Sequence, residues 1–297
     1  MLSKLIKNFI QKPIKINTLE LDRPIFIVGH ARAGSTALAA IINWHSHIGS
    51  AAPKPNLKYA GITEFLDAIR HHNSHLTYSE QLEQKDTWFR YFPGENIFTH
   101  MGKELIVEKL NLNVFEINKL KKELTRNFRG KRFLSKAPTN SFRIRILRHL
   151  FPDAKIIALY RKGPAVIASW GQRDYGFGKP VHWGTTRFEQ LPYQDGIRIF
   201  ARKWLEVIQY LESQKKEIGF YSLGYERLIQ NPLRELTRLF EYLEIPVESY
   251  ISKITLANKN KRWQEVIPQV YHELVLKETA EGQKILNDQF KADLSTI

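Results

Sequence analysis

The chain contains no cysteine, and this absence already excludes two kinds of chemistry. Without thiols there can be no disulfide bond and no thiolate metal site. No apolar run reaches the roughly 18 residues of a membrane span, so we expect no membrane-spanning helix. The N-terminal stretch MLSKLIKNFIQKPIK also lacks the apolar core and cleavage site of a signal peptide. We therefore expect a cytoplasmic protein.

The chain also has few acidic residues relative to its basic ones. The 297 residues include 45 Lys and Arg against 30 Asp and Glu, a formal net charge of +15. Such an excess favours anionic partners, which include nucleic acid, membranes, nucleotides and acidic substrates. Because the chain has no arginine-rich tail, zinc-ligand spacing or aromatic-basic RNA motif, we expect no nucleic-acid partner. Arg143, Arg145 and Arg148 are predicted to form a solvated face.

Residues 1–23 form a basic amphipathic segment in front of the domain predicted for residues 24–297. Its apolar residues fall at helical spacing among lysines: Leu2, Leu5, Ile6, Phe9 and Ile10. We expect a terminal helix that packs on the domain, since such stripes usually face a core. The alternative is weak contact with a membrane surface.

Strands alternate with helices along the rest of the chain. Ile25 to Val28 reads as a strand, followed by a glycine loop and a helix from Ser35 to Trp44. A second strand ends at Arg161, and Pro164 marks the start of the helix after it. Further elements are a strand at 133–135, a helix to Leu150 capped by Thr139, a helix at 195–216, a strand at 220–223, a helix from Pro232 and a helical tail at 262–290. This pattern predicts an α/β fold: a single domain with a mostly parallel central sheet flanked by helices.

The first loop lacks the lysine that a nucleotide triphosphatase needs. Gly29 and Gly34 have the G-x-x-x-x-G spacing of a phosphate loop and precede Ser35 and Thr36, but no lysine follows the second glycine. The nearest cation is Arg32. The second strand also ends in Arg161, where a magnesium-dependent phosphoryl transferase would want an aspartate. We therefore expect an anion held without metal, although a glycine loop alone fits a tight structural turn equally well.

Four segments, in the same order, resemble the sulfotransferase family. PIFIVGHARAGSTAL resembles its 5′-phosphosulfate loop, and FLSKAPTNSFRIRILRHLFPDAKIIALYRKGPAVIASW resembles its K-x-P segment and 3′-phosphate motif. YERLIQNPLRELTRLFEYLEIP resembles its tyrosine-glutamate strand end and following helix, and NKNKRWQ resembles its basic C-terminal loop. The resemblance covers roughly Pro24 to Gln264, with a divergent middle.

The resemblance implies a P-loop-like enzyme that transfers a sulfuryl group from 3′-phosphoadenosine 5′-phosphosulfate (PAPS) to a hydroxyl or amine, releasing 3′,5′-bisphosphoadenosine (PAP). Five residues would hold the 5′-phosphosulfate: Arg32, Ala33, Gly34, Ser35 and Thr36. Arg161 and Ser169 would hold the 3′-phosphate. Lys136 would lie close to the transferred group, and Lys261 or Arg262 would close over the nucleotide.

The loop departs from the family pattern in ways that affect its chemistry. Ala31 and Ala33 replace the usual proline and polar residue, and Arg32 replaces the lysine of several subfamilies. An arginine stays charged and does not readily donate a proton, so Arg32 is expected to act as an electrostatic clamp. Glu64 is the first candidate for the catalytic base, with His182 the second. The alternative for Glu64 is a solvated side chain near a helix start.

The acceptor is not predicted beyond its class. We expect a small natural product of secondary metabolism or a carbohydrate, bound by the divergent residues 53–127 and the loop 172–194. His71, His72 and His75 have the i, i+4 spacing of metal ligands but lack an obvious third ligand, so no metal site is expected. The alternative functions are a kinase-like phosphoryl transferase and a basic nucleic-acid-binding protein. The oligomeric state is not predicted.

Overall fold

The computed structural model describes residues 21–50, 62–71, 112–125, 132–172, 181–183, 186–188, 192–260 and 262–291. Most of the predicted N-terminal segment, residues 1–20, lies outside these ranges. None of the helices in the described ranges combines the length and apolarity needed to cross a bilayer.

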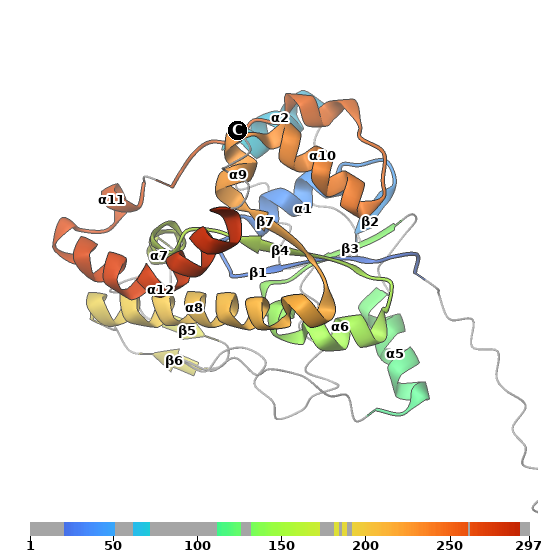
Figure 1. Ribbon diagram of the computed structural model, residues 1–297, viewed down its shortest axis with the longest axis horizontal. Helices are drawn as coiled ribbons and strands as arrows, with labels where there is room; N and C mark the ends of the chain where they lie inside the picture. The colour runs from blue at the N-terminus through green and yellow to red at the C-terminus, as the bar shows by residue number, and fades with distance from the viewer. Residues whose placement is uncertain are drawn as a thin grey trace, which may run out of the picture.

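A five-stranded sheet forms the centre of the molecule (Figure 1), in the order β2-β3-β1-β4-β7. Its strands are β1 (Ile25–Gly29), β2 (Ile48–Ser50), β3 (Arg132–Lys136), β4 (Lys155–Tyr160) and β7 (Tyr221–Gly224). Every pair in this sheet is parallel, which confirms the predicted parallel sheet. A separate antiparallel pair consists of β5 (Val181–Trp183) and β6 (Thr186–Phe188).

Helices cover both faces of the sheet (Figure 1). Above it in this view lie α1 (Ser35–Asn43), α2 (Ile62–His71), α9 (Tyr225–Gln230) and α10 (Pro232–Leu243). Below it lie α6 (Ile144–Leu150) and α8 (Tyr193–Ile218), with α5 (Val114–Thr125) at one end, while α12 (His272–Lys291) packs on α8. Beside the carboxyl ends of the strands lie α7 (Gly163–Gly171) and α11 (Trp263–Val266). Short 3-10 turns at Pro138–Arg143, Ser249–Lys253 and Gln269–Tyr271 complete the described elements.

β1 (IFIVG) is wholly apolar and β4 (KIIALY) nearly so, as expected of strands that are covered on both faces. All five residues of β1 are buried, and so are seven of the first eight residues of α1. Parallel pairing brings the carboxyl ends of β1, β3 and β4 to one edge, with Gly29 opposite Leu159 and Ile27 opposite Lys136. Ligands of open α/β sheets bind at this edge.

Two local predictions were wrong. Thr139 does not cap a helix, because a 3-10 turn follows β3 and α6 begins only at Ile144, with Arg143 at its N-cap position. The predicted solvated arginine face is also wrong. Arg143 is 1% exposed and donates to Asn140, while Arg148 donates to backbone carbonyls that include Ala154 and Gly219. Some of the excess basic residues therefore donate hydrogen bonds to the protein's own backbone carbonyl groups and are not available to a ligand.

Candidate functional site

The loop from His30 to Gly34 joins β1 to α1 through two glycines in the left-handed region. Gly29 has φ of 133° and Gly34 has φ of 100°. A Cβ at Gly29 would lie 2.3 Å from the carbonyl oxygen of Leu159, so only glycine allows β1 and β4 to approach this closely. The predicted strand, glycine loop and helix are therefore confirmed as a backbone unit.

This loop ends at an uncapped helix terminus. Within the described chain, Gly34 at the N-cap position has no capping side chain, and no acidic residue lies in the first turn of α1. The first N–H groups of a helix have no partner inside it, and together with the helix dipole they attract anions. Ala33 and Ser35 are buried, and Thr36 is partly exposed beside them. The geometry therefore suits an anion with two or more oxygens.

Arg32 joins this loop to α7. It has φ of 72°, and its Nε donates to Ser169 Oγ at 3.1 Å. Its own carbonyl oxygen accepts a hydrogen bond from Arg161 Nη1 at 3.0 Å. Three residues predicted for donor binding are thus brought together from two strand ends, across more than 120 positions of sequence.

Arg161 is the most constrained cation of the site. It follows β4 directly, is 8% exposed, and its guanidinium lies 4.5 Å above the Tyr225 ring. Its Nε donates to Asn260 Oδ1 at 3.1 Å, and its carbonyl oxygen accepts from Trp204 Nε1 at 3.0 Å. Burial lowers the pKa of the guanidinium, while Tyr225 opposes this effect. An arginine remains charged under such a shift, so Arg161 presents a fixed positive charge at the sheet edge.

Further cations come from the segment after η5 (Ser249–Lys253), which runs from Ile254 to Arg262. Burial, and then the charges of Arg262 and Arg161, lower the pKa of Lys259. Arg262 is exposed at the start of α11, and Lys261 lies outside the described residues. The cations that lie together here favour an anionic ligand.

Glu226 is the acidic residue of this region, at the start of α9. Its Oε1 accepts from the backbone N–H of Lys162 at 3.1 Å and from Asn260 Nδ2 at 3.0 Å. Burial raises the pKa of Glu226, opposed by hydrogen bonds from the backbone N–H groups of Lys162 and Glu226 and by the charges of Arg161 and Lys162. The carboxyl group therefore fastens the start of α7 to the segment that covers Arg161.

Lys136 and Ser141 approach the loop from β3. Lys136 is 2% exposed at the last position of β3 and pairs in register with Ile27 of β1. In the turn that follows, Ser141 Oγ accepts from the Gly29 N–H at 2.8 Å. The K-x-P segment is thus pinned to the beginning of the phosphate-type loop.

A buried polar layer lies beneath the loop. Burial lowers the pKa of His30 to about 3, and the charge of Lys203 adds to this effect, while a hydrogen bond to Ala31 opposes it. Trp170 lies 5.1 Å from the His30 ring and packs edge-on against Phe200. Trp170 is therefore a packing residue, and His30 is neutral at physiological pH.

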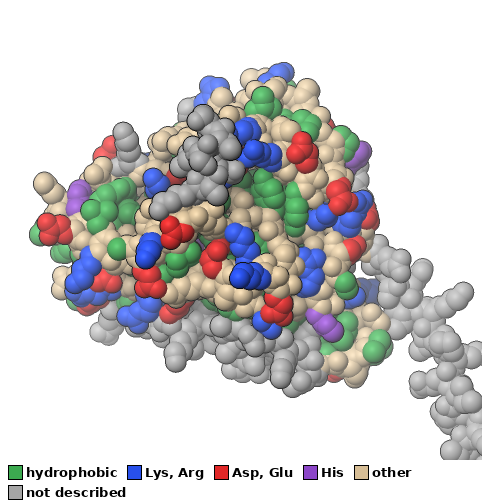
Figure 2. Space-filling view, viewed as in Figure 1, with side chains coloured by type: hydrophobic (Ala, Val, Ile, Leu, Met, Phe, Trp, Pro, Cys, Tyr) green, Lys and Arg blue, Asp and Glu red, His purple; other side chains and the backbone are tan. Residues whose placement is uncertain are grey.

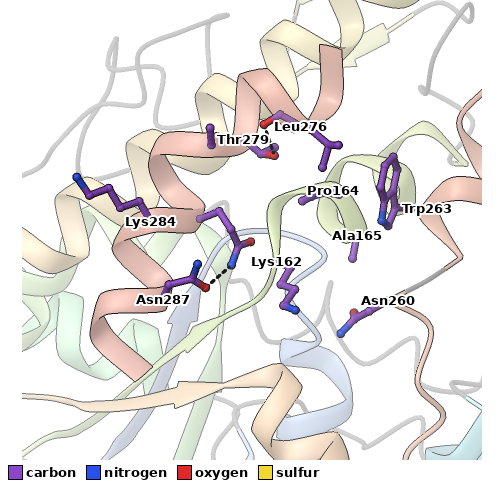
Figure 3. Close-up of a pocket in the computed structure, with 11 residues that line it drawn as sticks. Lys162, Pro164, Ala165, Asn260, Trp263, Leu276, Thr279, Lys284 and Asn287 are labelled. Atoms are coloured by element: carbon purple, nitrogen blue, oxygen red, sulfur yellow. Dashed lines mark hydrogen bonds between the residues drawn. The ribbon is translucent and has the colours of Figure 1, made fainter. Parts of the chain in front are cut away.

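A cavity of about 550 Å³ opens beside Lys162 (Figure 3). It lies between the start of α7, the segment at Asn260 and Trp263, and one face of α12. Lys162 and Asn260 line it near Trp263, whereas the Lys284 amine lies at the opposite side and extends away from Lys162. Through Asn260, which bonds to Arg161, the cavity adjoins the residues predicted to bind the donor.

The first catalytic-base candidate does not lie beside the loop. Glu64 is exposed in the first turn of α2, and the next residue, Phe65, stacks on Trp44 at 4.2 Å. Trp44 follows the end of α1 that is remote from the loop, roughly 13 Å along the helix axis from Ser35. The structure therefore does not place Glu64 against Arg32. The backbone of His182 lies in β5, but its side chain is outside the described part of the structure.

The histidine cluster is only partly described. His71 ends α2, while His72 and His75 lie outside the described residues. Among the residues that are described, no group of three His, Asp or Glu could hold a metal ion.

Sequence reasoning missed four residues that lie in this region. Asn260, Glu226, Lys259 and Ser141 were not predicted as site residues, although NKNKRWQ and YER were noted as segments. The usable signal was the position of Glu226 directly after a strand, at the same sheet edge as Arg161. No local sequence pattern could have identified Asn260, because it contacts Arg161 only where the folded chain brings together residues 99 positions apart.

A parallel α/β sheet with a glycine loop and clustered cations at its carboxyl edge is the arrangement expected of the sulfotransferase class. The chain matches the model of the Sulfotransferase family over residues 24–249, and it belongs to that family. It is an enzyme that transfers sulfate.

Its curated relatives are sulfotransferases of different acceptors. The omega-hydroxy-beta-dihydromenaquinone-9 sulfotransferase of Mycobacterium tuberculosis is 28% identical over 269 residues, covering 80% of this chain and 67% of that protein. Protein-tyrosine sulfotransferase A of Caenorhabditis elegans is 24% identical over 264 residues, covering 85% of this chain and 60% of that protein.

Solved structures show the same fold. A sulfotransferase of Alicyclobacillus acidocaldarius has a TM-score of 0.53 at 16% identity, covering 92% of this chain and 98% of that one. A sulfotransferase of Mycobacterium avium has a TM-score of 0.50 at 14% identity, covering 91% of this chain and 77% of that one. The predicted P-loop-like sulfotransferase fold is confirmed by these likenesses.

Proposed function

We propose that this sulfotransferase takes its sulfuryl group from PAPS and passes it to a hydroxyl group by metal-free in-line displacement. The acceptor oxygen forms a new bond to sulfur and loses its proton to a base. The bond between sulfur and the bridging oxygen breaks, and PAP leaves with the electron pair. No atom changes its oxidation state in this transfer, so no oxidant or reductant is needed.

The observation that carries the proposal is the junction of Arg32, Arg161 and Ser169. Arg32 and Arg161 lie at the ends of adjacent parallel strands and share one hydrogen bond, while Ser169 receives another from Arg32. One anion seat lies at the loop and the start of α1, and a second at Arg161 and Ser169. A nucleotide with both a 5′-phosphosulfate and a 3′-phosphate is the donor that uses two such seats. Lys259 and Arg262 add positive charge beside the second seat.

The same residues supply the chemistry. Negative charge develops on the bridging oxygen, and preorganised donors aimed at it are worth several kcal/mol, about 3 to 4 for a single donor. Arg32, the loop amides at Ala33 to Thr36, and Lys136 are the groups proposed for this oxygen. Because these cations are fixed by burial and hydrogen bonds, they need little reorganisation during the reaction. Glu64 and His182 remain the proposed bases. Glu64 acts as the base only on an acceptor that enters from the side of α2, because it does not lie against Arg32.

We propose a hydroxyl acceptor on a small natural product or a carbohydrate. The names of both curated relatives point to hydroxyl acceptors, one an omega-hydroxy compound and the other tyrosine. A chain without cysteine fits a cytoplasmic enzyme. We also propose that nucleic acid is not a partner: on the face shown in Figure 2, Lys and Arg are interspersed with Asp and Glu and do not form one basic patch.

Thermal stabilisation by ligands tests this proposal. PAP is expected to raise the melting temperature, whereas ATP with magnesium and an oligonucleotide should have much smaller effects, since only PAP fills both anion seats. Stabilisation by ATP with magnesium alone would overturn the donor assignment. A screen of hydroxyl and amine acceptors with sulfur-labelled donor then identifies the acceptor class by transfer of label.

A further inference from the structure

One carboxylate oxygen connects three distant segments of the donor site. Glu226 Oε1, just after β7, accepts from the Lys162 N–H at the start of α7 and from Asn260 Nδ2 in the C-terminal segment. The two bonds are 3.1 and 3.0 Å long. Hydrogen bonds to an ionised acceptor are stronger than neutral ones. Glu226 therefore fixes where Asn260 lies relative to the end of β4.

The contact with Glu226 also fixes which way the Asn260 amide faces. Its nitrogen donates to the carboxylate, so its Oδ1 is directed to the other side, where it accepts from Arg161 Nε at 3.1 Å. The reversed amide would set an oxygen against the carboxylate and a nitrogen against the guanidinium, losing both bonds. The order Glu226, Asn260, Arg161 is thus a directional chain of hydrogen bonds, which we call the Glu226–Asn260 relay.

The relay determines which donors of Arg161 remain for a ligand. A guanidinium has five N–H donors. Among the described residues, Nε donates to Asn260 and one Nη1 hydrogen to the Arg32 carbonyl, while the ring of Tyr225 covers one face of the group. Three N–H groups on Nη1 and Nη2 are left, in one plane and in one orientation. That arrangement suits forked binding of a phosphate.

We propose that Asn260 and Glu226 are positioning residues that aim Arg161 at the 3′-phosphate of the donor, and so set the preference for a 3′-phosphorylated nucleotide. The inference rests on the proposed function. Neither side chain needs to touch the nucleotide, because both act through the orientation of Arg161. Loss of the relay therefore weakens the part of the affinity that the 3′-phosphate contributes and spares the part that the 5′ end contributes.

The test compares two probes that differ only in that phosphate. Calorimetric dissociation constants are measured for PAP and for adenosine 5′-monophosphate, with wild type, Asn260→Ala, Glu226→Ala and the double variant. Each single variant is expected to weaken PAP binding about tenfold and to leave the monophosphate within about twofold, since a hydrogen bond to a charged group is lost. Because both residues belong to one relay, the double variant should be little worse than either single variant.

A conservative change and two matched controls complete the design. Glu226→Gln keeps an acceptor oxygen for both donors and should retain PAP affinity within about threefold. Gln264→Ala and Glu265→Ala remove an exposed amide and an exposed carboxylate just beyond the same segment and should change neither constant.

The outcomes separate the relay from the donor assignment. Wild type that fails to prefer PAP over the monophosphate overturns the proposed donor. Wild type that prefers PAP, combined with relay variants that keep the full preference, overturns the relay. Equal loss of both ligands or additive effects in the double variant would also overturn it, because they indicate a structural role. Should Glu226→Ala not fold, Asn260→Ala, in a partly exposed segment, decides the matter alone.

Discussion

Arg161 Nη1 donates to the carbonyl oxygen of Arg32 at 3.0 Å, so one cation of the donor site is bonded to the backbone of the other. Arg32 in turn donates to Ser169, eight residues beyond Arg161. The loop after β1 and the helix after β4 are therefore coupled at the residues proposed to bind the two ends of the nucleotide.

Substitution of Arg161 tests the second seat. Arg161→Ala is expected to abolish the thermal stabilisation by PAP, because the forked contact and the bond to the loop are both lost. Arg161→Lys keeps the charge but not the fork, so it should recover only a small part of the shift. Arg202→Ala, an exposed arginine on α8, should behave like wild type. Full stabilisation of Arg161→Ala by PAP would remove this residue from the donor site.

Substitution of Gly34 tests the loop. A Cβ there would lie 2.7 Å from the Tyr225 ring, at φ of 100°. Gly34→Ala should destabilise the fold by about 2 to 4 kcal/mol, from strain and displacement of Tyr225, and should weaken PAP binding at least tenfold. Gly219→Ala is the matched control, since its φ is 65° and no atom lies within 4 Å of its added Cβ. It should cost only about 1 kcal/mol in chemical unfolding and leave PAP binding unchanged. Equal effects on binding would contradict the assigned role of the loop.

Glu64→Gln tests the base assignment. A general base contributes about two orders of magnitude to turnover, so the variant should lose roughly that factor while binding PAP normally. The side chain is exposed, and the packing of α2 is carried by Phe65 on Trp44, so the substitution should leave the melting temperature unchanged. Steady-state turnover with labelled donor is the measurement. Turnover equal to wild type would remove Glu64 from the mechanism.

His30 makes stability depend on pH. Its pKa is about 3 in the folded chain against 6.5 as the ordinary value, so the unfolded state binds the proton more readily. The stability that neutral His30 contributes is present above pH 6.5 and is lost as the pH falls from there towards 3. Between pH 7 and 4 this amounts to roughly 3 kcal/mol of unfolding free energy. His30→Phe, which keeps a ring beside Trp170, should lack this component in urea titrations. The same acid sensitivity in the variant would assign the effect to other groups.

Local patterns were enough for the parts of the site that are continuous in sequence. The glycines at 29 and 34 predicted a tight turn into a helix, and the strand ending at Arg161 predicted a second unit at the same sheet edge. The helix expected at Thr139 was wrong because Ser141 bonds to Gly29 and draws the chain after β3 into a 3-10 turn. No pattern within that segment contains this contact, which joins residues 112 positions apart.

By itself, the sequence determined the alternation of apolar strands and helices, and with it the parallel sheet and the place of both loops. These follow from short-range periodicity and from glycine's freedom at positive φ. Only the tertiary structure decided what the cations do. Arg148 donates hydrogen bonds to backbone carbonyls, whereas Arg161 contacts Arg32, Asn260 and Tyr225 at the sheet edge. The number of charged residues does not distinguish these two roles. Whether a guanidinium is structural or available to a ligand depends on the partners that distant segments of the chain bring to it.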